Sequence, residues 1–255
     1  MNKASHFGMA FHQGLGFSKA LMKIPAAEAI FWPGCALLNL DGEILEKTLE
    51  ILRRAEPEIA LACGCCGQPT VYLFPEKVEK RRKKLISLLR KRGVKRIYTA
   101  CPNCTLQFQN IKEFEILPIW PVLATQIKPE DLTPSSETFI WHDPCPTRHD
   151  PVQQNASRQL LNICGCDCTE PEHTGCHTRC CGNFHMLAST DPEKSAKLRH
   201  SRLKEFPEER TIVSSCEGCL GAFRGEGRKT VHLLELLFGQ SKSHGWGNRF
   251  KTTMK

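Results

Sequence analysis

A pattern of five cysteines occurs twice in this chain, and it limits the possible folds more than any other feature. In each copy a single cysteine is followed by a Cys-Cys-Gly sequence and then by a Cys-x-x-Cys sequence. The interval from Cys66 to Cys101 is 35 positions, and so is the interval from Cys181 to Cys216. Only the first interval differs, with 30 positions in one copy and 35 in the other. The chain therefore contains an internal duplication with a change of loop length between the copies. The ten cysteines are Cys35, Cys65, Cys66, Cys101 and Cys104, then Cys145, Cys180, Cys181, Cys216 and Cys219.

Strand-like and helix-like segments alternate in the same order in both copies. The runs 96–100 and 211–215 are short and strand-like, and each ends directly at a Cys-x-x-Cys sequence. We expect further strands at 29–32 and 138–142, helices at 76–92 and 191–206, and closing apolar segments at 116–123 and 231–238. This order predicts an α/β fold, with two tandem homologous βαβ-type repeats, mostly parallel sheets, and metal-cluster loops at the carboxyl ends of the strands.

The same pattern predicts the domain organisation. A segment containing two prolines and two serines separates the copies and is typical of a linker. We expect an N-terminal extension at 1–27, a first repeat at 28–127, a linker at 128–137, a second repeat at 138–238 and a polar C-terminal tail at 239–255.

Fifteen cysteines in 255 residues are explained either by disulfides or by thiolate metal sites. The number is odd, and residues 1–30 contain no uninterrupted apolar run of the kind that a secretion signal needs. The most apolar later stretch, 116–127, is twelve residues long with two prolines, which is too short to span a bilayer. We therefore expect a cytoplasmic protein, free or peripheral to a membrane complex, whose cysteines bind metal.

Five thiolates per copy favour a metal cluster over a single ion. A structural zinc ion takes four ligands, so one cysteine would be left over, whereas a cluster with several irons can use all five. Adjacent cysteines cannot easily bind one small ion, but they can reach two metals of one cluster if the next residue frees the backbone. Gly67 and Gly182 occupy that position and are expected to support cofactor binding.

Positive charge is concentrated in one segment. Residues 76–96 contain eleven Lys or Arg and two Glu, a net charge of +9, whereas the whole chain carries +8. The segment is either a solvated helix face or a docking surface for an acidic electron-transfer partner. Nucleic acid is a weaker candidate, because no aromatic residue lies within this segment to stack on bases.

The residues next to the first cysteine of each copy resemble a known family. Trp32-Pro-Gly-Cys35 and His142-Asp-Pro-Cys145 are similar to the two repeat openings of the cysteine-rich CCG-domain proteins. This family includes the B subunit of heterodisulfide reductase and subunits of lactate, glycolate and glycerol-3-phosphate oxidation systems. The resemblance covers residues 31–238 and implies that the ten cysteines hold two [4Fe-4S] clusters, of noncubane geometry in the heterodisulfide reductase relative.

The resemblance implies an oxidoreductase subunit that reduces a disulfide-type substrate or exchanges electrons with a quinone-linked partner. No glycine-rich flavin or nicotinamide fingerprint follows a strand, so electrons would come from a partner subunit that carries flavin or iron–sulfur clusters. The alternative is a zinc-stabilised interaction module that binds nucleic acid or an acidic protein through the basic helix.

Histidine and arginine are concentrated near the second set of cysteines. Because disulfide reduction consumes protons and arginine can hold an anionic group, these residues are candidates for catalysis, although each histidine can equally be an ordinary loop residue. The candidates are His142, Arg148, His149 and His185. The matching loops of the first copy, 31–40 and 67–74, contain no histidine, arginine or lysine. We therefore expect the first cluster to relay electrons and the second to bind the acceptor.

Five cysteines lie outside the duplicated pattern. They are Cys63, Cys164, Cys166, Cys168 and Cys176. Those between Cys164 and Cys176, with His173 and His177, can bind a further zinc ion, form a redox-active pair, or be inert thiols in an inserted loop. We favour the inert interpretation.

Overall fold

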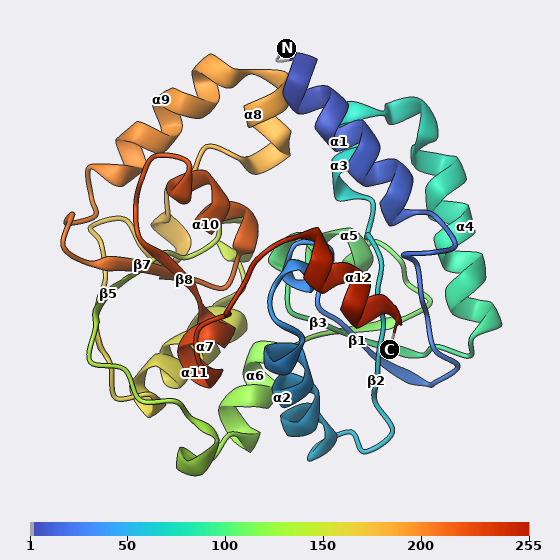
Figure 1. The fold of residues 1–255 in the computed structure, drawn as a ribbon, viewed down its shortest axis with the longest axis horizontal. Coiled ribbons are helices and arrows are strands. Elements are labelled where there is room, and N and C mark those ends of the chain that lie inside the picture. The colour runs from blue at the N-terminus through green and yellow to red at the C-terminus, as the bar shows by residue number, and fades with distance from the viewer. Residues whose placement is uncertain (1–2, 255) are drawn as a thin grey trace. The chain divides into compact units, whose positions relative to one another are not determined.

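The computed structural model describes residues 3–254, which form two compact units (Figure 1). The first unit contains Met1–Ile119 together with Lys242–Lys255, and the second contains Trp120–Ser241. This division differs from the expected one. Residues 120–127 and the expected linker 128–137 group with the second unit, and residues from 242 onward group with the first unit instead of forming a separate tail.

Each unit contains one four-stranded sheet. The strands are β1 (Ala29–Trp32), β2 (Ala60–Leu61), β3 (Arg96–Thr99) and β4 (Glu115–Pro118), then β5 (Thr138–Trp141), β6 (Asp167–Thr169), β7 (Thr211–Ser214) and β8 (Thr230–His232). All pairings between these strands are parallel, and the orders β2-β1-β3-β4 and β6-β5-β7-β8 have the same topology. The predicted α/β fold of two tandem repeats is confirmed.

Helices flank the sheet of the first unit. They are α1 (Lys3–Gly16), α2 (Gly42–Arg53), α3 (Gln68–Leu73), α4 (Val78–Lys91), α5 (Pro102–Gln109) and α12 (Trp246–Met254). The α2 helix begins where the side chain of Asp41 accepts a hydrogen bond from the backbone N–H of Glu43. Leu85 and Leu89 of α4 are buried in one core cluster with Trp32 of β1. Their four-residue spacing places both leucines on one face of the helix.

The second unit repeats this arrangement. Its helices are α6 (Ile119–Gln126), which begins one residue before the unit boundary, α7 (Pro151–Ile163), α8 (Leu187–Thr190), α9 (Pro192–Leu203), α10 (Glu217–Arg224) and α11 (Leu233–Phe238). Both α7 and α9 begin with an Asp cap followed by Pro at the first helical position, a combination that favours helix initiation. Short 3-10 turns complete the two units at Leu37–Asn39, Pro75–Lys77, Pro129–Asp131, Cys145–Thr147, Gly175–His177 and Phe184–Met186.

The parallel strands place the cysteine loops at one edge of each sheet. Strands β1, β2 and β3 lead into the loops that carry the first set of cysteines, and β5, β6 and β7 do the same for the second set. Cys65 lies four residues after the end of β2, whereas its counterpart Cys180 lies eleven residues after the end of β6. The unequal first interval of the duplication is therefore explained by a longer loop at 170–179.

The C-terminal segment forms a helix rather than the expected polar tail. In α12, Arg249 and Thr253 are buried although both are polar. Gly245 and Asn248 bond to the backbone carbonyl of Asn39, which ties the start of the helix to the first unit. Within residues 3–254, no helix is long and apolar enough to cross a membrane.

Candidate metal centres

The first set of cysteines comes together at the sheet edge of the first unit. Cys35 is hydrogen-bonded to Cys65, Cys65 to Cys66, Cys66 to Cys104, and Cys104 to Cys101. The thiols thus form a continuous chain of five. The loop before Cys35 approaches the others so closely that a Cβ atom on Gly34 would lie 3.1 Å from Sγ of Cys104.

The second set forms the same chain in the same order. Cys145 is hydrogen-bonded to Cys180, Cys180 to Cys181, Cys181 to Cys219, and Cys219 to Cys216. Each cysteine contacts the partners that correspond to those of its counterpart in the first unit. The structure therefore brings together all ten cysteines singled out from the sequence, as two sets of five.

The first cysteine of each Cys-Cys pair is the most acidic position of its set. Hydrogen bonds from Cys145 and Cys181 lower the pKa of Cys180 to about 2, and the corresponding bonds from Cys35 and Cys66 hold the pKa of Cys65 well below its usual value. The backbone also contributes, because the N–H of the following glycine donates to Sγ over 3.4 Å at Cys65 and 3.3 Å at Cys180. One thiolate per set is therefore favoured even without metal.

Left-handed glycines shape both Cys-Cys turns. Gly67 has a φ angle of +88° and Gly182 of +85°, in a region of backbone conformation that residues other than glycine rarely adopt. This conformation turns the N–H of each glycine toward a thiol instead of away from it.

The spread of the thiols is too wide for one small ion. Tetrahedral zinc with Zn–S bonds of about 2.3 Å requires sulfur atoms about 3.8 Å from one another. Among the described residues, no three of these sulfur atoms lie within 4.8 Å of one another. Thiols that are neighbours in each chain touch, but no three of them surround a single point, and this arrangement fits a cluster of several metal ions better than one ion.

Polar side chains from two terminal helices reach the first set. Gln13 of α1 is fully buried and its Nε2 donates to Sγ of Cys65 over 3.2 Å. The neighbouring His12 lies 3.2 Å, through Nε2, from Nη1 of Arg249 of α12. Burial lowers the pKa of His12; the charge of Cys65 opposes this shift and the charge of Arg249 adds to it. Arg249 is fully buried, and its Nε and Nη2 have no hydrogen-bond partner among the described residues.

Basic groups lie beside the first set as well as the second. The loops 31–40 and 67–74 do lack them, but α1, α4 and α12 supply His12, Arg81 and Arg249 instead. Sequence reasoning missed these residues because they lie far along the chain from any cysteine of the set. The weak signal that could have found Arg249 is a polar amphipathic helix in an otherwise unexplained tail.

At the second set, His142 is the predicted residue that lies against the thiols. A ligand atom of its ring and the sulfur atoms of Cys181 and Cys219 are all within 4.8 Å of one another. His142 is fully buried, and its Nδ1 accepts a hydrogen bond from Nε of Arg202 over 3.2 Å. Burial, with the charge of Arg202 adding to it, lowers the pKa of His142 to about 3. The ring is therefore neutral, with its proton on Nε2.

The other three predicted residues lie differently. Arg148 donates from Nη2 to the carbonyl oxygen of Thr178 over 2.5 Å, so it fastens the long loop before Cys180. His149 and His185 are both exposed, and His185 stacks against Phe184 with ring centroids 3.9 Å apart. The structure thus places only His142 in the buried surroundings of the second set.

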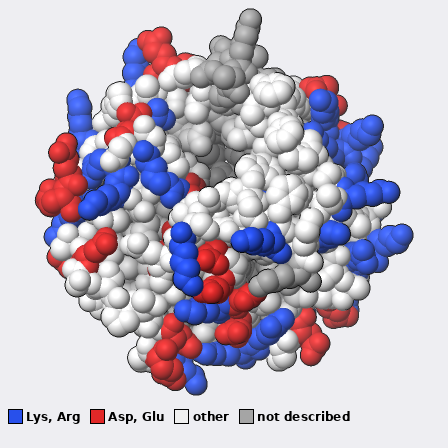
Figure 2. Space-filling model, in the orientation of Figure 1, with Lys and Arg blue, Asp and Glu red and all other residues white. Residues whose placement is uncertain are grey.

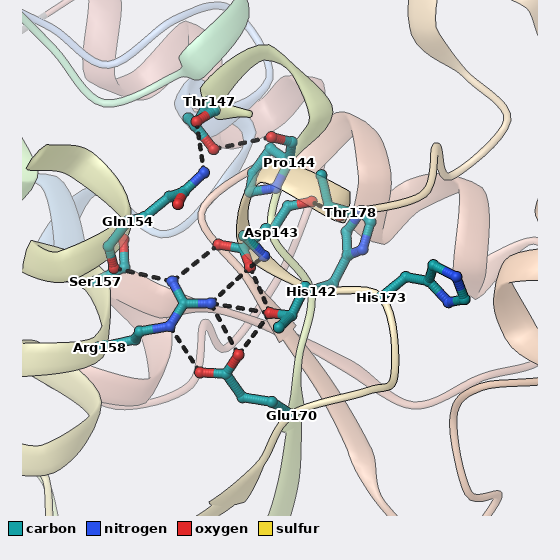
Figure 3. A network of polar contacts seen from close by, with 12 residues as sticks. His142, Asp143, Pro144, Thr147, Gln154, Ser157, Arg158, Glu170, His173 and Thr178 are labelled. Atoms are coloured by element: carbon teal, nitrogen blue, oxygen red, sulfur yellow. Dashed lines mark hydrogen bonds and ion pairs between the residues drawn. The ribbon is translucent and has the colours of Figure 1, made fainter. Parts of the chain in front are cut away.

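A buried carboxylate holds the long loop 170–179 in place. Figure 3 shows Arg158 between the carboxylates of Asp143 and Glu170, with Nη2 2.7 Å from Oδ2 of Asp143. The same Asp143 oxygen accepts from Oγ1 of Thr174 over 2.8 Å and from the N–H of Gly175 over 2.7 Å. Asp143 lies between His142 and Cys145, so this network positions the loop before Cys180 against the loop that carries Cys145.

The five remaining cysteines do not form a further centre of this kind. Cys63 is buried beside Thr253, Cys176 is exposed, and Cys164, Cys166 and Cys168 are partly buried. Cys166 and Cys168 are hydrogen-bonded to each other. Among the described residues, no three of the side chains proposed for a further zinc site lie within reach of one ion.

The basic segment forms α4 and its flanks. Figure 2 shows Lys and Arg side chains gathered along the edge where Figure 1 places α4. Lys80, Lys83 and Lys91 are exposed, whereas Arg90, Lys95 and Arg96 pair with glutamates of the same unit. The exposed side of the helix therefore retains a net positive charge.

The fold and the thiol chains define a tandem cysteine-rich α/β protein. Residues 29–109 and 139–224 match the cysteine-rich domain CCG, and the chain belongs to this family. A duplicated CCG domain with fifteen cysteines indicates a protein that binds iron–sulfur clusters.

Comparison with whole proteins adds no function. No curated protein matches the chain. Solved structures with some likeness include an aspartate racemase from Picrophilus torridus, with 12% identity, 88% of this chain and 98% of that chain covered, and a TM-score of 0.34. The glutamate racemase from Aquifex pyrophilus has 17% identity, 82% and 80% coverage, and a TM-score of 0.33. Likeness at this level supports no conclusion about fold or activity.

Proposed function

We propose that this chain is an iron–sulfur redox subunit with one [4Fe-4S] cluster, cubane or noncubane, in each unit. The observation that carries the proposal is the pair of five-thiol chains connected in the same order. The ligands are Cys35, Cys65, Cys66, Cys101 and Cys104 in the first unit, and Cys145, Cys180, Cys181, Cys216 and Cys219 in the second.

The surroundings of the thiols fit such a group. All fifteen cysteines are free thiols, so none of the proposed ligands is used in a disulfide. A cluster with thiolate ligands is anionic, and a fully buried arginine with unpartnered N–H groups, Arg249 or Arg202, lies near each set. The glycine N–H groups at Gly67 and Gly182 donate to sulfur, which stabilises thiolates. When bound, the clusters would supply one-electron transfer.

The protein's own side chains would set the conditions for that chemistry. Burial of Cys65, Cys104, Cys181, Cys216 and Cys219 excludes water from much of each set. The N–H groups aimed at sulfur and the buried arginines favour the more negative, reduced state. In the second unit, the neutral ring of His142 keeps a proton on Nε2 beside the thiols. His149 and His185 are proposed as proton donors to the acceptor, and Arg148 as a group that binds an anionic part of it.

The proposed activity is that of an oxidoreductase subunit that depends on a partner for electrons. The acceptor or donor is a disulfide-type substrate or a quinone-linked protein, and the partner is a flavin or iron–sulfur subunit. The exposed positive side of α4 supports docking of an acidic partner.

Metal analysis of anaerobically purified protein tests the cluster proposal. We expect iron and inorganic sulfide in similar amounts, a brown colour, and electron paramagnetic resonance signals from two clusters. Cys66→Ala and Cys181→Ala should each remove or remodel only the cluster of their own unit, with Cys176→Ala, an exposed thiol outside both sets, as the control. Stoichiometric zinc without sulfide would instead support the zinc-stabilised interaction module.

A further inference from the structure

A cavity in the first unit reaches one of the proposed ligands. Its volume is about 270 Å³, and it lies among α3, α4 and α5. The polar part of its wall consists of Cys66, Thr70, Arg81, Arg82, Gln107 and Asn110. Cys66 is only partly buried, so a molecule in this cavity could come close to the first thiol chain.

Two arginines are held in fixed positions at the cavity. Nη1 of Arg81 donates to Oγ1 of Thr70 over 2.8 Å and to Oε1 of Gln13 over 3.3 Å. The Arg81 guanidinium also lies over the ring of Phe17, 4.9 Å from its centroid. Nη2 of Arg82 donates to the carbonyl oxygen of Asn110 over 2.9 Å. Arg81 is therefore oriented by three contacts before any ligand arrives, which lowers the entropy cost of binding, whereas Arg82 is exposed and is held by one hydrogen bond.

Within residues 3–254, neither arginine is hydrogen-bonded to a carboxylate, although the charges of Cys65 and Glu76 act on Arg81 from a greater distance. Their hydrogen-bond partners are a hydroxyl, an amide oxygen and a carbonyl oxygen, all uncharged. Among the described residues, neither guanidinium forms an ion pair with a carboxylate. Each group has further N–H donors available, and a guanidinium matches the geometry of carboxylate and phosphate oxygens.

The second unit has no arginine pair at the equivalent positions. In the register of the duplication, Arg81 and Arg82 correspond to Ala196 and Lys197, and Lys197 pairs with Glu193 over 2.7 Å. The helix there also packs directly on the Cys-Cys-Gly turn, because a Cβ atom on Gly182 would lie 2.3 Å from the carbonyl oxygen of Ser195.

The first unit is open at the same place. A Cβ atom on Gly67 would meet nothing closer than the ring of Phe17 at 3.4 Å. Both units gather five thiols, but the second has Ala196 and Lys197 in place of the arginine pair and a helix packed directly on its Cys-Cys-Gly turn, so metal binding alone does not require the arginine pair. The arginine pair needs a separate explanation.

We propose that this cavity is a binding site for a small organic anion, a carboxylate or a phosphate ester, held by Arg81 and Arg82 beside Cys66. The volume lies at the low end of ligand pockets and excludes a quinone with a long tail, which would also leave both charges unpaired. The site deepens the proposed function, because a bound anion would lie next to the first cluster. Its binding is nevertheless measurable on its own.

Calorimetric titration of the anaerobically purified full-length chain tests the site. Acetate and inorganic phosphate represent the two anion classes, and acetamide is a neutral molecule of nearly the same shape as acetate. Titrations are made at constant ionic strength so that general screening is the same in each. We expect saturable binding of at least one anion, no binding of acetamide, and a change in the visible spectrum when the anion binds.

Variants of neighbouring residues on α4 distinguish specific anion binding from a general effect of positive charge. Arg82→Gln should weaken anion binding about tenfold, because it removes one charge-assisted contact, whereas Lys83→Gln removes the same charge from an exposed neighbour and should change nothing. Arg81→Gln should act in the same direction, but Arg82 is the sharper test because Arg81 also supports Thr70 and Gln13. Absence of saturable binding, or equal weakening by Arg82→Gln and Lys83→Gln, overturns the anion site. Loss of iron and sulfide with binding retained contradicts only the cluster proposal.

Discussion

Arg202 and His142 form a buried pair beside the second thiol chain, with Nε of Arg202 donating to Nδ1 of His142 over 3.2 Å. The first unit has a pair of the same kind, in which Nη1 of Arg249 lies 3.2 Å from Nε2 of His12. Both arginines are fully buried and retain N–H groups without partners among the described residues. The two pairs come from unrelated segments, so the duplication does not explain them. Each unit therefore has a buried guanidinium near its thiols, as an anionic group would require, and in the second unit Nη1 of this guanidinium also pairs with Oε2 of Glu205 over 2.7 Å.

The conformation and close packing of Gly182 predict that adding a single methyl group there strongly destabilises the protein. Gly182→Ala would place Cβ 2.3 Å from the carbonyl oxygen of Ser195 in a left-handed conformation, so we expect a loss of at least about 2 kcal/mol in the free energy of unfolding. Gly67→Ala should cost less, because its nearest contact would be 3.4 Å away. Gly221→Ala, on α10 with open space around it, is the control and should be neutral or stabilising. Denaturant unfolding of the three variants measures the order, and equal losses at Gly182 and Gly221 would contradict this account.

The Arg158–Asp143 ion pair predicts that the long loop depends on one side chain. The Asp143 side chain is 1% exposed, and Arg158→Gln leaves its carboxylate buried without its charged partner. Removing one partner of a buried pair typically costs about 3–5 kcal/mol, so the second unit should unfold more easily and the loop 170–179 should be cleaved faster by proteases. Lys194→Gln, an exposed change in the same unit, should leave both measurements unchanged. Unaltered proteolysis in Arg158→Gln would show that the loop is held by other contacts.

Sequence reasoning predicted the parts of the fold that are dictated by local pattern. The strand at 29–32 matches β1, and the strand at 96–100 exceeds β3 by one residue, because apolar β-branched and aromatic runs ended at a cysteine loop. Strands β2 and β6 were not predicted, since two or three residues are too few to show an alternating pattern. Helix α12 was missed because its stability depends on burying Arg249 and Thr253 against residues more than two hundred positions earlier, and local composition contains no such information.

For the candidate site, the cysteines could be predicted from the sequence but their surroundings could not. Spacing alone selected ten cysteines that the structure gathers into two chains, because the duplication is visible in the sequence. The surroundings of the first chain depend on tertiary contacts from α1, α4 and α12, so the loops 31–40 and 67–74, which contain no His, Arg or Lys, gave no sign of the three basic residues near that chain. The local concentration of histidine near the second chain similarly overstated its importance, since His149 and His185 are exposed.

His232 predicts a loss of stability in acid. Its side chain is fully buried, Nδ1 caps α11 by accepting from the N–H of Leu234, and burial lowers its pKa to about 3. Below the ordinary histidine pKa of about 6.5 the unfolded chain takes up a proton that the folded chain does not, so stability falls by roughly 1.4 kcal/mol per pH unit as the pH drops from about 6.5 toward 3. His232→Gln should therefore show a shallower decline of melting temperature between about pH 6.5 and 4.5, whereas exposed His244→Gln should keep the original slope. Parallel slopes for all three proteins would exclude His232 as a contributor.

The exposed side of α4 predicts salt-sensitive association with an acidic electron-transfer protein. Replacing Lys80, Lys83 and Lys91 by Glu should slow association with an acidic ferredoxin by about tenfold or more at low salt. The difference should shrink as ionic strength rises, because exposed charges are screened within about 10 Å at 0.1 M. The control replaces Lys194, Lys197 and Lys204 of the second unit by Glu, which changes the net charge equally at another place. Stopped-flow kinetics across a salt series separates the two sites, and equal slowing by both triple variants would leave α4 as an ordinary solvated face.

The two buried arginines predict that the clusters can be tuned one at a time. Arg249→Gln removes a positive charge near Cys35 and Cys65, so the first cluster should become harder to reduce and its reduction potential should move to a more negative value. Arg202→Gln should have the same effect on the second cluster only. Arg249→Lys keeps the charge and should cause a smaller shift, and Lys251→Gln on the exposed side of α12 should cause none.

Redox titration followed by electron paramagnetic resonance measures both potentials in each variant, with iron and sulfide content determined alongside. If both potentials move together in Arg249→Gln at full cluster content, the charge acts on the whole molecule, and the assignment of Arg249 to the first centre is wrong.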